Sequence, residues 1–521
     1  MSHPPVSDTT HQPQSKPPSA ILIVGAGVFG LSTAAAILSS SLYAQTHLTI
    51  VDPALPNLDQ GKNDETLQYS PSAQTASIDS SRIIRPDYAN PAYSNLAAEA
   101  QEAWRSRYTR EGVYHESGLA VVAGSKGSEY VEAACRNVQD QPRKTEDRLE
   151  EPTHVERLDT PQDIRAILCL PPNHSPRLGQ PESEHLGRTG YINRSSGWAN
   201  AEGAMRIEMR RILEHRQDPA RLTLRRAKVD RFIFSRADNK SKPSVTGVYL
   251  TDSSCLKADL IILATGAWTP SLLDLTGRVQ STAQCLAYLP LTTSEADSLS
   301  AMPVLLNLST GCFVIPPALN TASPSASPIL RSSTATYEEE EDAYYTHHLK
   351  VAGHCHGYLS PRPITVATPS SKIRLCPSLP SSSPVPPPAL EGLREFLCSI
   401  FPSSSPLSSR LFSSSRLCHY TDTPTGDFLI TYHPEYENLF LCTGGSGHGF
   451  KFLPVLGREV LKILERRGGE WQRLWGWKDQ HVGEWKGDGS RGGEMGELLE
   501  NAMKEGGEME REMEREKQSK L

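Results

Sequence analysis

The chain has 521 residues and a formal net charge of −7, from 53 Lys and Arg against 60 Asp and Glu. This mildly acidic balance gives no long-range attraction to nucleic acid or to an anionic membrane surface, so we expect neither partner. The most apolar stretch, residues 20–38, is interrupted by glycines and polar side chains and falls short of the ~20 apolar residues that a bilayer span needs. Ten cysteines without a C-x-x-C pair argue against a zinc cluster, and we expect no metal site.

The first patterned elements follow a tail. Residues 1–18 are polar and Pro-rich, without the apolar run of a secretory signal, and they predict a disordered tail. Ile21 to Val24 are apolar and β-branched, which predicts a buried parallel strand, and Leu31 to Leu38 continue as a helix of small residues. A second strand is expected over Leu48 to Val51. Strand, helix and strand in this order predict the start of an α/β nucleotide-binding domain.

The turn between the first strand and the helix reads G-x-G-x-x-G, at Gly25, Gly27 and Gly30. The first glycine permits a tight turn, the second lets a diphosphate approach the backbone, and the third lets the helix pack close to the strand. Asp52 ends the second strand about 20 residues later, where a carboxylate accepts hydrogen bonds from an adenosine ribose. The glycine turn and Asp52 together predict dinucleotide binding. The Asp52 carboxylate disfavours NADP because it would repel the 2′-phosphate.

Two later segments favour FAD over a nicotinamide cofactor. Residues 258–268, ADLIILATGAW, predict an apolar strand that ends in a turn at Gly266. Residues 443–449, TGGSGHG, return to glycine-rich sequence near the far end of the chain. A flavin needs a second site of this kind for its isoalloxazine end. A short nicotinamide-binding domain would normally end within the first half of the chain.

Five segments, in this order along the chain, resemble the FAD-dependent amino-acid oxidases of glutathione-reductase type. The resemblance is to the branch of monomeric sarcosine oxidase, pipecolate and saccharopine oxidases and fructosyl amino acid oxidases (amadoriases), and it spans about residues 20–460 with insertions. The segments are IVGAGVFGLSTA (23–34), SRIIRPDY (81–88), LKVAGH (349–354), CHYTDTP (418–424) and GGSGHGFKFLPVLG (444–457). The resemblance implies an α/β (α+β) fold, in which a Rossmann-type FAD-binding domain is interleaved with a β-rich substrate domain.

Arg82 and Arg85 stand three residues apart, on an expected loop that enters a helix with Leu96, Ala100 and Trp104 at helical spacing. Arginine forms bidentate contacts with carboxylates and flavin carbonyls. Without further context the pair could be two surface arginines. The resemblance implies that Arg82 lies against the flavin and that Arg85 holds a substrate carboxylate.

Lys350 lies in a β-rich segment, HHLKVAGH, where a lysine is usually solvated. The resemblance implies that it lies beside flavin N5, where a fixed positive charge stabilises the anion formed as dioxygen is reduced. His354 matches an active-site histidine of the same family. The neighbouring histidines have no partner acid, so this cluster does not predict a metal site.

Cys418 and Tyr420 lie in the segment RLCHYTDTP. A lone cysteine is usually a small buried hydrophobe. The resemblance implies instead that Cys418 is bonded to the flavin 8α carbon and that Tyr420 closes the substrate pocket.

The glycine loop at 444–453 leads into an expected helix start, with His448 and Lys451 inside the match. Backbone N–H groups of such a loop can face the flavin O2 edge. The resemblance implies that Lys451 pairs with the substrate carboxylate alongside Arg85, and that His448 lies near the flavin. Some amadoriases have Arg at the position of His448 and lack the paired arginines, which favours sarcosine-, pipecolate- or saccharopine-like substrates.

The predicted catalytic residues are thus Lys350, Arg82, Arg85, Lys451, His354, His448 and Tyr420. The predicted cofactor-binding residues are Gly25, Gly27, Val28, Phe29, Gly30, Asp52, Ser81, Arg82, Val229, Gly266, Cys418, Gly445, Gly447, His448, Gly449 and Lys451.

The expected domain organisation is discontinuous. The FAD-binding domain takes residues 19–105, 195–275 and 415–466, and the substrate domain takes 106–194 and 276–414 with Ser/Pro-rich insertions. Residues 467–521 are expected to form a polar tail. Such insertions and tails account for a hydrophobic fraction of only 37%.

The expected function is oxidation of a secondary-amine amino acid by FAD, with reduction of dioxygen to hydrogen peroxide. The alternatives are a fructosyl amino acid oxidase, an NAD-linked dehydrogenase and a flavin-binding protein without turnover. We expect a monomer. The final tripeptide Ser519-Lys520-Leu521 matches the receptor-read peroxisomal address, so we expect an import receptor as partner and a peroxisomal location.

Overall fold

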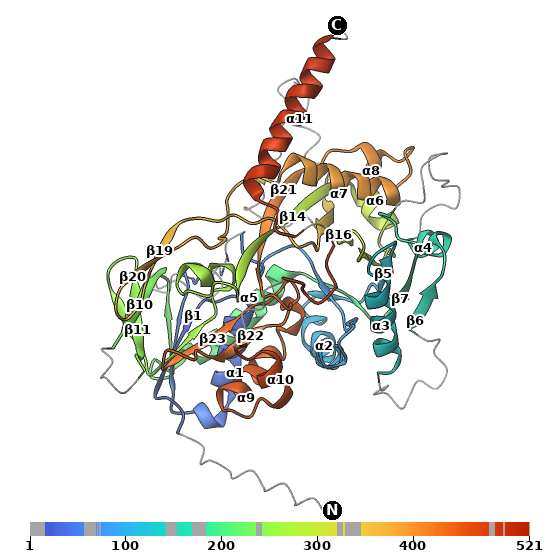
Figure 1. The fold of residues 1–521 in the computed structure, drawn as a ribbon. Coiled ribbons are helices and arrows are strands. Elements are labelled where there is room, and N and C mark those ends of the chain that lie inside the picture. The colour runs from blue at the N-terminus through green and yellow to red at the C-terminus, as the bar shows by residue number, and fades with distance from the viewer. Residues whose placement is uncertain are drawn as a thin grey trace, which may run out of the picture.

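The computed structural model describes residues 16–56, 69, 71, 74–141, 154–168, 184–235, 242–319, 327–328, 345–478, 485–492 and 495–519. Two large sheets, one of six strands and one of nine, form the two halves of the molecule (Figure 1). None of the described helices is both long enough and apolar enough to cross a membrane.

The six-stranded sheet has the strand order β22-β23-β13-β1-β2-β9. β1 pairs in parallel with both β2 and β13, so Ile23 lies between Ile50 and Ile262. All three side chains are fully buried, as a parallel sheet covered on both faces requires. The strands are β1 (Ala20–Val24), β2 (His47–Val51), β9 (Leu222–Arg225), β13 (Leu260–Leu263), β22 (Leu429–Tyr432) and β23 (Leu439–Thr443).

The nine-stranded sheet has the order β17-β21-β14-β18-β16-β15-β5-β7-β6. Its long central strands β14, β18 and β21 pair antiparallel. The strands are β5 (Leu119–Ala123), β6 (Val155–Leu158), β7 (Thr189–Asn193), β14 (Gln280–Leu291), β15 (Val304–Asn307), β16 (Cys312–Leu319), β17 (Ser327–Pro328), β18 (His347–Gly353) and β21 (Ser414–Asp422).

Three small sheets complete the strand set. The first contains β3 (Arg82–Ile84), β8 (Gly197–Ala199) and β4 (Tyr114–His115). The second contains β10 (Val229–Phe234), β11 (Val245–Leu250) and β12 (Cys255–Lys257). The third pairs β19 (Ile364–Ala367) with β20 (Lys372–Leu375).

Helices cover both halves (Figure 1), and α1 contacts both α9 and α5. The helices are α1 (Val28–Ser39), α2 (Pro91–Ala103), α3 (Ser128–Gln139), α4 (Pro161–Ile167), α5 (Ala201–Leu213), α6 (Thr293–Ser298), α7 (Pro387–Ile400), α8 (Pro406–Ser409), α9 (Leu456–Leu464), α10 (Gly469–Leu474) and α11 (Leu499–Ser519). Short 3₁₀ or π turns lie at Ser41–Tyr43, Trp104–Tyr108, Glu214–Gln217, Gly266–Ser271 and Phe450–Phe452.

The expected strand–helix–strand start is confirmed by β1, α1 and β2, and the expected helix after Arg85 is confirmed by α2. The prediction for Arg82 was wrong in one respect. Arg82 begins strand β3, which pairs with β8, rather than lying on a loop. The chain at 197–199 supplies this pairing, and local sequence does not indicate it.

Two segments differ from the expected domain boundaries. Strand β21, expected in the FAD-binding domain, belongs to the nine-stranded sheet through its pairing with β14. Residues from 467 onward, expected to be a polar tail, include the fully buried Trp475, which packs into the core beneath the six-stranded sheet. Only α11 extends away from the body of the molecule in the described part of this region (Figure 1).

Candidate active site

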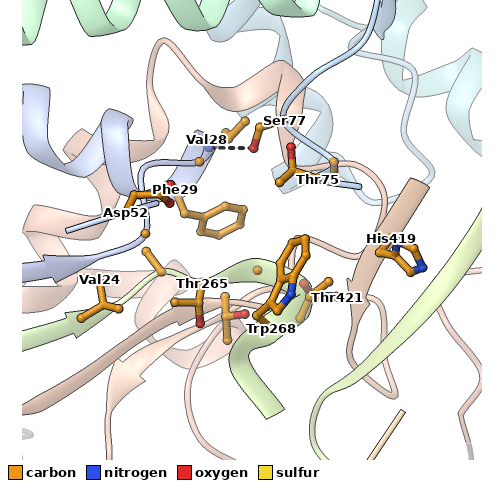
Figure 2. A pocket seen from close by; sticks show the side chains of 18 of the residues that line it. Val24, Val28, Phe29, Asp52, Thr75, Ser77, Thr265, Trp268, His419 and Thr421 are labelled. Atoms are coloured by element: carbon orange, nitrogen blue, oxygen red, sulfur yellow. Dashed lines mark hydrogen bonds between the residues drawn. The ribbon is translucent and has the colours of Figure 1, made fainter. Parts of the chain in front are cut away.

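A cavity of about 510 Å³ lies where β1, β2 and β13 end. The cavity is lined by the glycine turn after β1, by the loop after β13 and by residues of β21 and the 443–449 loop. Figure 2 shows the side chains of Phe29 and Trp268 directed into it. Its position at the carboxyl ends of parallel strands is where open α/β sheets bind nucleotides.

The glycines of the turn are required by the backbone geometry. Gly25 has φ of +106°, and a Cβ atom there would lie 2.4 Å from the carbonyl oxygen of Ala264. A Cβ on Gly30 would lie 1.9 Å from the carbonyl oxygen of Gly25, so α1 packs against the turn only with glycine there. Helix α1 has no side-chain cap at Gly27, and its first turn faces the cavity. This arrangement leaves N–H groups and the positive end of a helix for a diphosphate.

Asp52 lies at the end of β2 and lines the same cavity. Its carboxylate accepts hydrogen bonds from the backbone N–H groups of Ala26 and Ala54, at 2.8 and 2.7 Å. Burial raises the pKa of Asp52 above its ordinary value, against the opposing effect of these two hydrogen bonds. The residue is therefore fixed in place at the expected ribose position.

Most of the predicted cofactor-binding residues line this cavity. Those that do are Gly25, Gly27, Val28, Phe29, Asp52, Arg82, Val229, Gly266, Gly445, Gly447 and Gly449, while Gly30, Ser81, Cys418, His448 and Lys451 do not. Sequence reasoning missed Thr75, Ser77 and Trp268. Ser77 accepts a hydrogen bond from the N–H of Val28 at 3.2 Å and so braces the glycine turn (Figure 2).

All seven predicted catalytic residues line a second cavity of about 60 Å³. It adjoins the first, because Arg82, Tyr420, Gly447 and Phe450 line both. The wall includes four basic side chains from separate parts of the chain, since β3, β18 and the Phe450–Phe452 turn meet here. The tertiary structure thus assembles one cationic cavity beside the nucleotide cavity.

Asp79 binds the basic residues on one side of this second cavity. Its Oδ2 lies 2.6 Å from Lys350 Nζ, 2.7 Å from Arg82 Nη1 and 3.1 Å from Arg416 Nη2. Tyr288 donates a further hydrogen bond to Oδ1 at 2.7 Å. Burial lowers the pKa of Lys350 to about 7, although Asp79 opposes this shift. Sequence reasoning missed Asp79, although it lies three residues before Arg82.

Arg85 and Lys451 lie on the other side of the second cavity and form no ion pair within the described residues. Arg85 Nη1 is buried without a hydrogen-bond partner. Lys451 Nζ donates to Tyr88 Oη at 2.8 Å and to the carbonyl oxygen of His448 at 3.0 Å. Burial and the charge of Arg85 hold the pKa of Lys451 well below its usual value. Two buried basic side chains that form no ion pair among the described residues are suited to an anionic ligand.

The two histidines of the cavity are fixed by neighbours. His448 Nδ1 lies 2.9 Å from Tyr88 Oη, and its Nε2 lies 2.9 Å from the carbonyl oxygen of Gly426. Burial lowers the pKa of both His354 and His448, so both rings are neutral near pH 7. Tyr88 was not singled out from the sequence, although it connects Lys451 with His448.

Cys418 is fully buried on β21, two residues from Tyr420 and therefore on the same face of the strand. Arg82 Nη2 donates a hydrogen bond to its sulfur at 3.2 Å. Cys418 does not itself line either cavity, although His419 and Tyr420 line the nucleotide cavity. Among the described residues, no group of three His, Cys, Asp or Glu side chains is placed to hold a metal ion.

The nucleotide cavity at the strand ends, joined to a small cavity lined by basic side chains, is the arrangement expected of a nucleotide-dependent enzyme. The chain belongs to the family of FAD dependent oxidoreductases, whose model matches residues 20–463. It is therefore an FAD-dependent oxidoreductase, and both the expected family and the expected fold class are confirmed.

Relatives cover nearly the whole chain. Amino acid oxidase imqH of Aspergillus flavus is 30% identical over 88% of this chain and 97% of its own length. L-saccharopine oxidase of Schizosaccharomyces pombe is 26% identical over 88% and 93%. The crystal structure of fructosamine oxidase (Amadoriase II) from Aspergillus fumigatus superposes with a TM-score of 0.65 at 25% identity, covering 92% of this chain and 95% of that one.

Proposed function

We propose that the protein is an FAD-dependent amino-acid oxidase whose substrate is a secondary-amine amino acid. The proposal rests on Arg85 and Lys451, which lie in the second cavity without an acidic partner among the described residues. A substrate carboxylate supplies that partner. We call these two residues the carboxylate clamp.

The nucleotide cavity fits FAD, because its glycine turn, helix N-terminus and Asp52 match the groups that an ADP moiety requires. When bound, FAD supplies the two-electron acceptor that dioxygen reoxidises with release of hydrogen peroxide. The carboxylate clamp holds the substrate so that its amine-bearing carbon faces the nucleotide cavity. The imine product takes up water to give an amine and an aldehyde or oxo-acid, or remains cyclic when the substrate is cyclic.

Charge in the cavity selects the protonation state of the substrate. Arg82, Arg85, Lys350 and Lys451 surround the reacting position, and four basic side chains repel an ammonium group. The site therefore favours the neutral amine, whose lone pair assists removal of hydride from the adjacent carbon. The protonated form of Lys350 stabilises the superoxide anion that dioxygen forms when it accepts its first electron.

The substrate class is tested by a peroxide assay on purified protein. The panel holds sarcosine, L-pipecolate, L-saccharopine and two fructosyl amino acids, with NAD⁺ added in parallel. We expect peroxide from one of the first three and no reduction of NAD⁺. Peroxide from the fructosyl substrates alone would establish the amadoriase alternative, which the similarity to Amadoriase II supports. If none of the five substrates causes oxygen uptake, the proposal is contradicted.

The role of Lys350 is tested by Lys350→Met, which retains most of the side-chain volume and removes the charge. The reduced variant should react with oxygen about 10²–10³-fold more slowly in stopped flow. Oxygen reactivity equal to that of the unmodified protein would refute this role.

A covalent flavin bond through Cys418 is the finer part of the proposal. It is supported by the buried thiol, by its position on the face of β21 that also presents Tyr420, and by the Arg82 contact. Under denaturing electrophoresis, flavin fluorescence should remain with the polypeptide and should be lost in Cys418→Ala. Fluorescence that migrates away from the unmodified chain would disprove the bond.

The proposal extends to a peroxisomal location, which the terminal Ser519-Lys520-Leu521 supports; Lys520 and Leu521 lie outside the described residues. This location also suits an enzyme that releases peroxide. A fluorescent protein fused in front of the full chain should co-localise with a peroxisomal marker and become diffuse when Leu521 is removed. A diffuse signal from the full chain would contradict the proposal.

A further inference from the structure

Residues 485–492, here called the C-terminal strap, pack beside the wall of the second cavity, because Ser490 contacts His354 and Arg491 lies over the ring of Tyr420. The N–H groups of Lys486 and Gly487 donate to the carbonyl oxygen of Pro424, at 3.0 and 2.9 Å. At the other end, His356 donates its N–H to the carbonyl oxygen of Gly492 at 3.1 Å. Pro424 follows β21 and His356 follows β18, so the strap connects the two strands that contribute Tyr420 and Lys350.

A buried ion pair fastens the strap beside the substrate position. Arg491 makes two hydrogen bonds of 2.7 Å to the Asp422 carboxylate, and both side chains are less than 10% exposed. The Arg491 guanidinium also lies 5.5 Å from the ring centre of Tyr420. A bidentate pair of this kind fixes both position and orientation.

The strap presents one carboxylate, that of Asp488, between two glycines. Gly487 and Gly489 have φ of +62° and +83°, which favours glycine and turns the chain sharply on either side of Asp488. Asp488 Oδ1 accepts hydrogen bonds from the N–H and Oγ of Ser490, at 3.0 and 2.6 Å. Ser490 Oγ in turn lies 3.4 Å from Nε2 of His354, which lines the second cavity.

Asp488 differs in exposure from the buried acids near the cavity, Asp79, Asp87 and Asp422. Asp79 is bound to three basic side chains, and Asp422 is bound to Arg491. Asp488 is exposed, and no described residue forms an ion pair with it.

Asp488 also lies within electrostatic range of the carboxylate clamp. Burial is the largest cause of the lowered pKa of Lys451, His354 and His448, and the Asp488 carboxylate opposes the shift in all three. Ser490 joins Asp488 to His354 in the wall of the second cavity, so the Asp488 carboxylate lies close enough to reach the far end of a ligand held by the clamp.

We propose that Asp488 binds a cationic group of the substrate, so that the enzyme prefers amino acids with an ammonium or guanidinium group beyond the reacting amine. This inference rests on the proposed function, because it takes the carboxylate clamp as the other point of attachment. The reacting amine itself is not the partner of Asp488, since four basic side chains surround its position. The strap therefore sets substrate length and charge.

Ligand binding to the holoenzyme tests directly whether Asp488 binds a cationic group, and it requires no turnover. Calorimetry compares a series of ω-amino acids, from 4-aminobutanoate to 8-aminooctanoate, with the unsubstituted alkanoates of equal chain length. At one length or more, the ω-amino acid should bind on the order of tenfold more tightly than its alkanoate. Asp488→Asn should abolish this preference, so that each ω-amino acid binds no more tightly than the alkanoate of equal length. Asparagine keeps the Oδ1 atom that Ser490 binds, so the strap turn is retained.

Glu500→Gln is the matched control, because it removes one exposed acidic charge from the following helix α11 and should leave the preference intact. Three results would overturn the inference: no preference for the amino group at any length, a preference that persists in Asp488→Asn, or an equal change in both series. The third result would mean that Asp488 affects only the protonation of the carboxylate clamp and does not bind the amino group of the ligand.

Failure of the proposed function has a different signature. If neither series binds, or if Arg85→Gln leaves alkanoate binding unchanged, the carboxylate clamp is wrong and the inference falls with it. If alkanoates bind through Arg85 and the amino group adds nothing, only the role of Asp488 is refuted.

Discussion

Lys350 Nζ lies 2.6 Å from Asp79 Oδ2, and both side chains are excluded from solvent. The pair joins β18 to the segment before β3, and the two residues are 271 positions apart in the chain. Asp79 thereby sets the position of Lys350. It also keeps a larger fraction of Lys350 protonated, because its negative charge opposes the lowering of the lysine pKa by burial.

Asp79→Asn should lower the pKa of Lys350 further below about 7, because it removes the negative charge that opposes burial. In the unmodified enzyme, the protonated fraction of Lys350 falls as pH rises through about 7, so its reaction with oxygen should slow over that range. In the variant the same loss should occur at lower pH. Stopped-flow reoxidation of reduced enzyme between pH 5 and 9 measures both profiles.

Asp79→Asn should also destabilise the fold by about 3–5 kcal/mol, since it leaves buried cations uncompensated. Tyr288→Phe is the matched control, because it removes one hydrogen bond to Asp79 and leaves the charge. It should cost about 0.5–1.5 kcal/mol and leave the pH profile unchanged. Identical pH profiles for Asp79→Asn and the unmodified enzyme would exclude control of Lys350 by Asp79.

Arg85→Gln should weaken carboxylate binding by about 1.5–3 kcal/mol, roughly 10- to 150-fold in Kd, because a charge-assisted contact is lost. Binding should also take up a proton at pH values above the lowered pKa of Lys451. The bound anion raises the lowered pKa of Lys451 and restores its charge. Calorimetry in buffers of different ionisation enthalpy counts that proton, and the uptake should vanish in Lys451→Met. An uptake that is the same in Lys451→Met would assign it to another group.

Two glycine-to-alanine changes within helices should have opposite effects. Gly392 lies in α7 with no atom within 4 Å of an added Cβ, so Gly392→Ala should stabilise the protein by about 0.5–1 kcal/mol. Gly30 lies in α1, where an added Cβ would meet the carbonyl oxygen of Gly25 at 1.9 Å. Gly30→Ala should destabilise by about 1–3 kcal/mol and reduce FAD content, because α1 must move away from the turn. Thermal unfolding and the flavin-to-protein absorbance ratio measure both effects, and equal shifts in the two variants would contradict this account.

Acid should destabilise the protein through its buried histidines. Burial lowers the pKa of His348, His419 and His433 to about 4, from 6.5. Below pH 6.5 the unfolded chain therefore binds more protons than the folded one, and the free energy of unfolding falls as pH falls. The loss should approach roughly 1.4 kcal/mol per pH unit for each histidine until the folded forms titrate near pH 4.

His433→Asn tests the origin of this acid effect, because His433 lies outside both cavities and asparagine does not titrate. Its slope of stability against pH between 6.5 and 4.5, measured by urea unfolding, should be shallower than that of the unmodified protein. A slope that stays the same would assign the acid effect to other groups.

The sequence by itself determined the local geometry of the nucleotide site. The spacing of Gly25, Gly27 and Gly30 after an apolar strand is a local requirement of a tight turn and a closely packed helix, so neighbouring residues are enough to define it. The motif segments also indicated, as catalytic, seven of the twelve residues that line the second cavity.

Only the tertiary structure decided what surrounds those residues. The partners of Asp79, the pairing of β3 with β8 and the contact of Tyr88 with Lys451 join positions far apart in the chain, and no local periodicity encodes them. The same holds for the C-terminal strap, whose polar sequence resembles a solvated tail. Backbone hydrogen bonds and the Arg491–Asp422 pair hold it beside the wall of the second cavity, and they form only when β18 and β21 are assembled in one sheet.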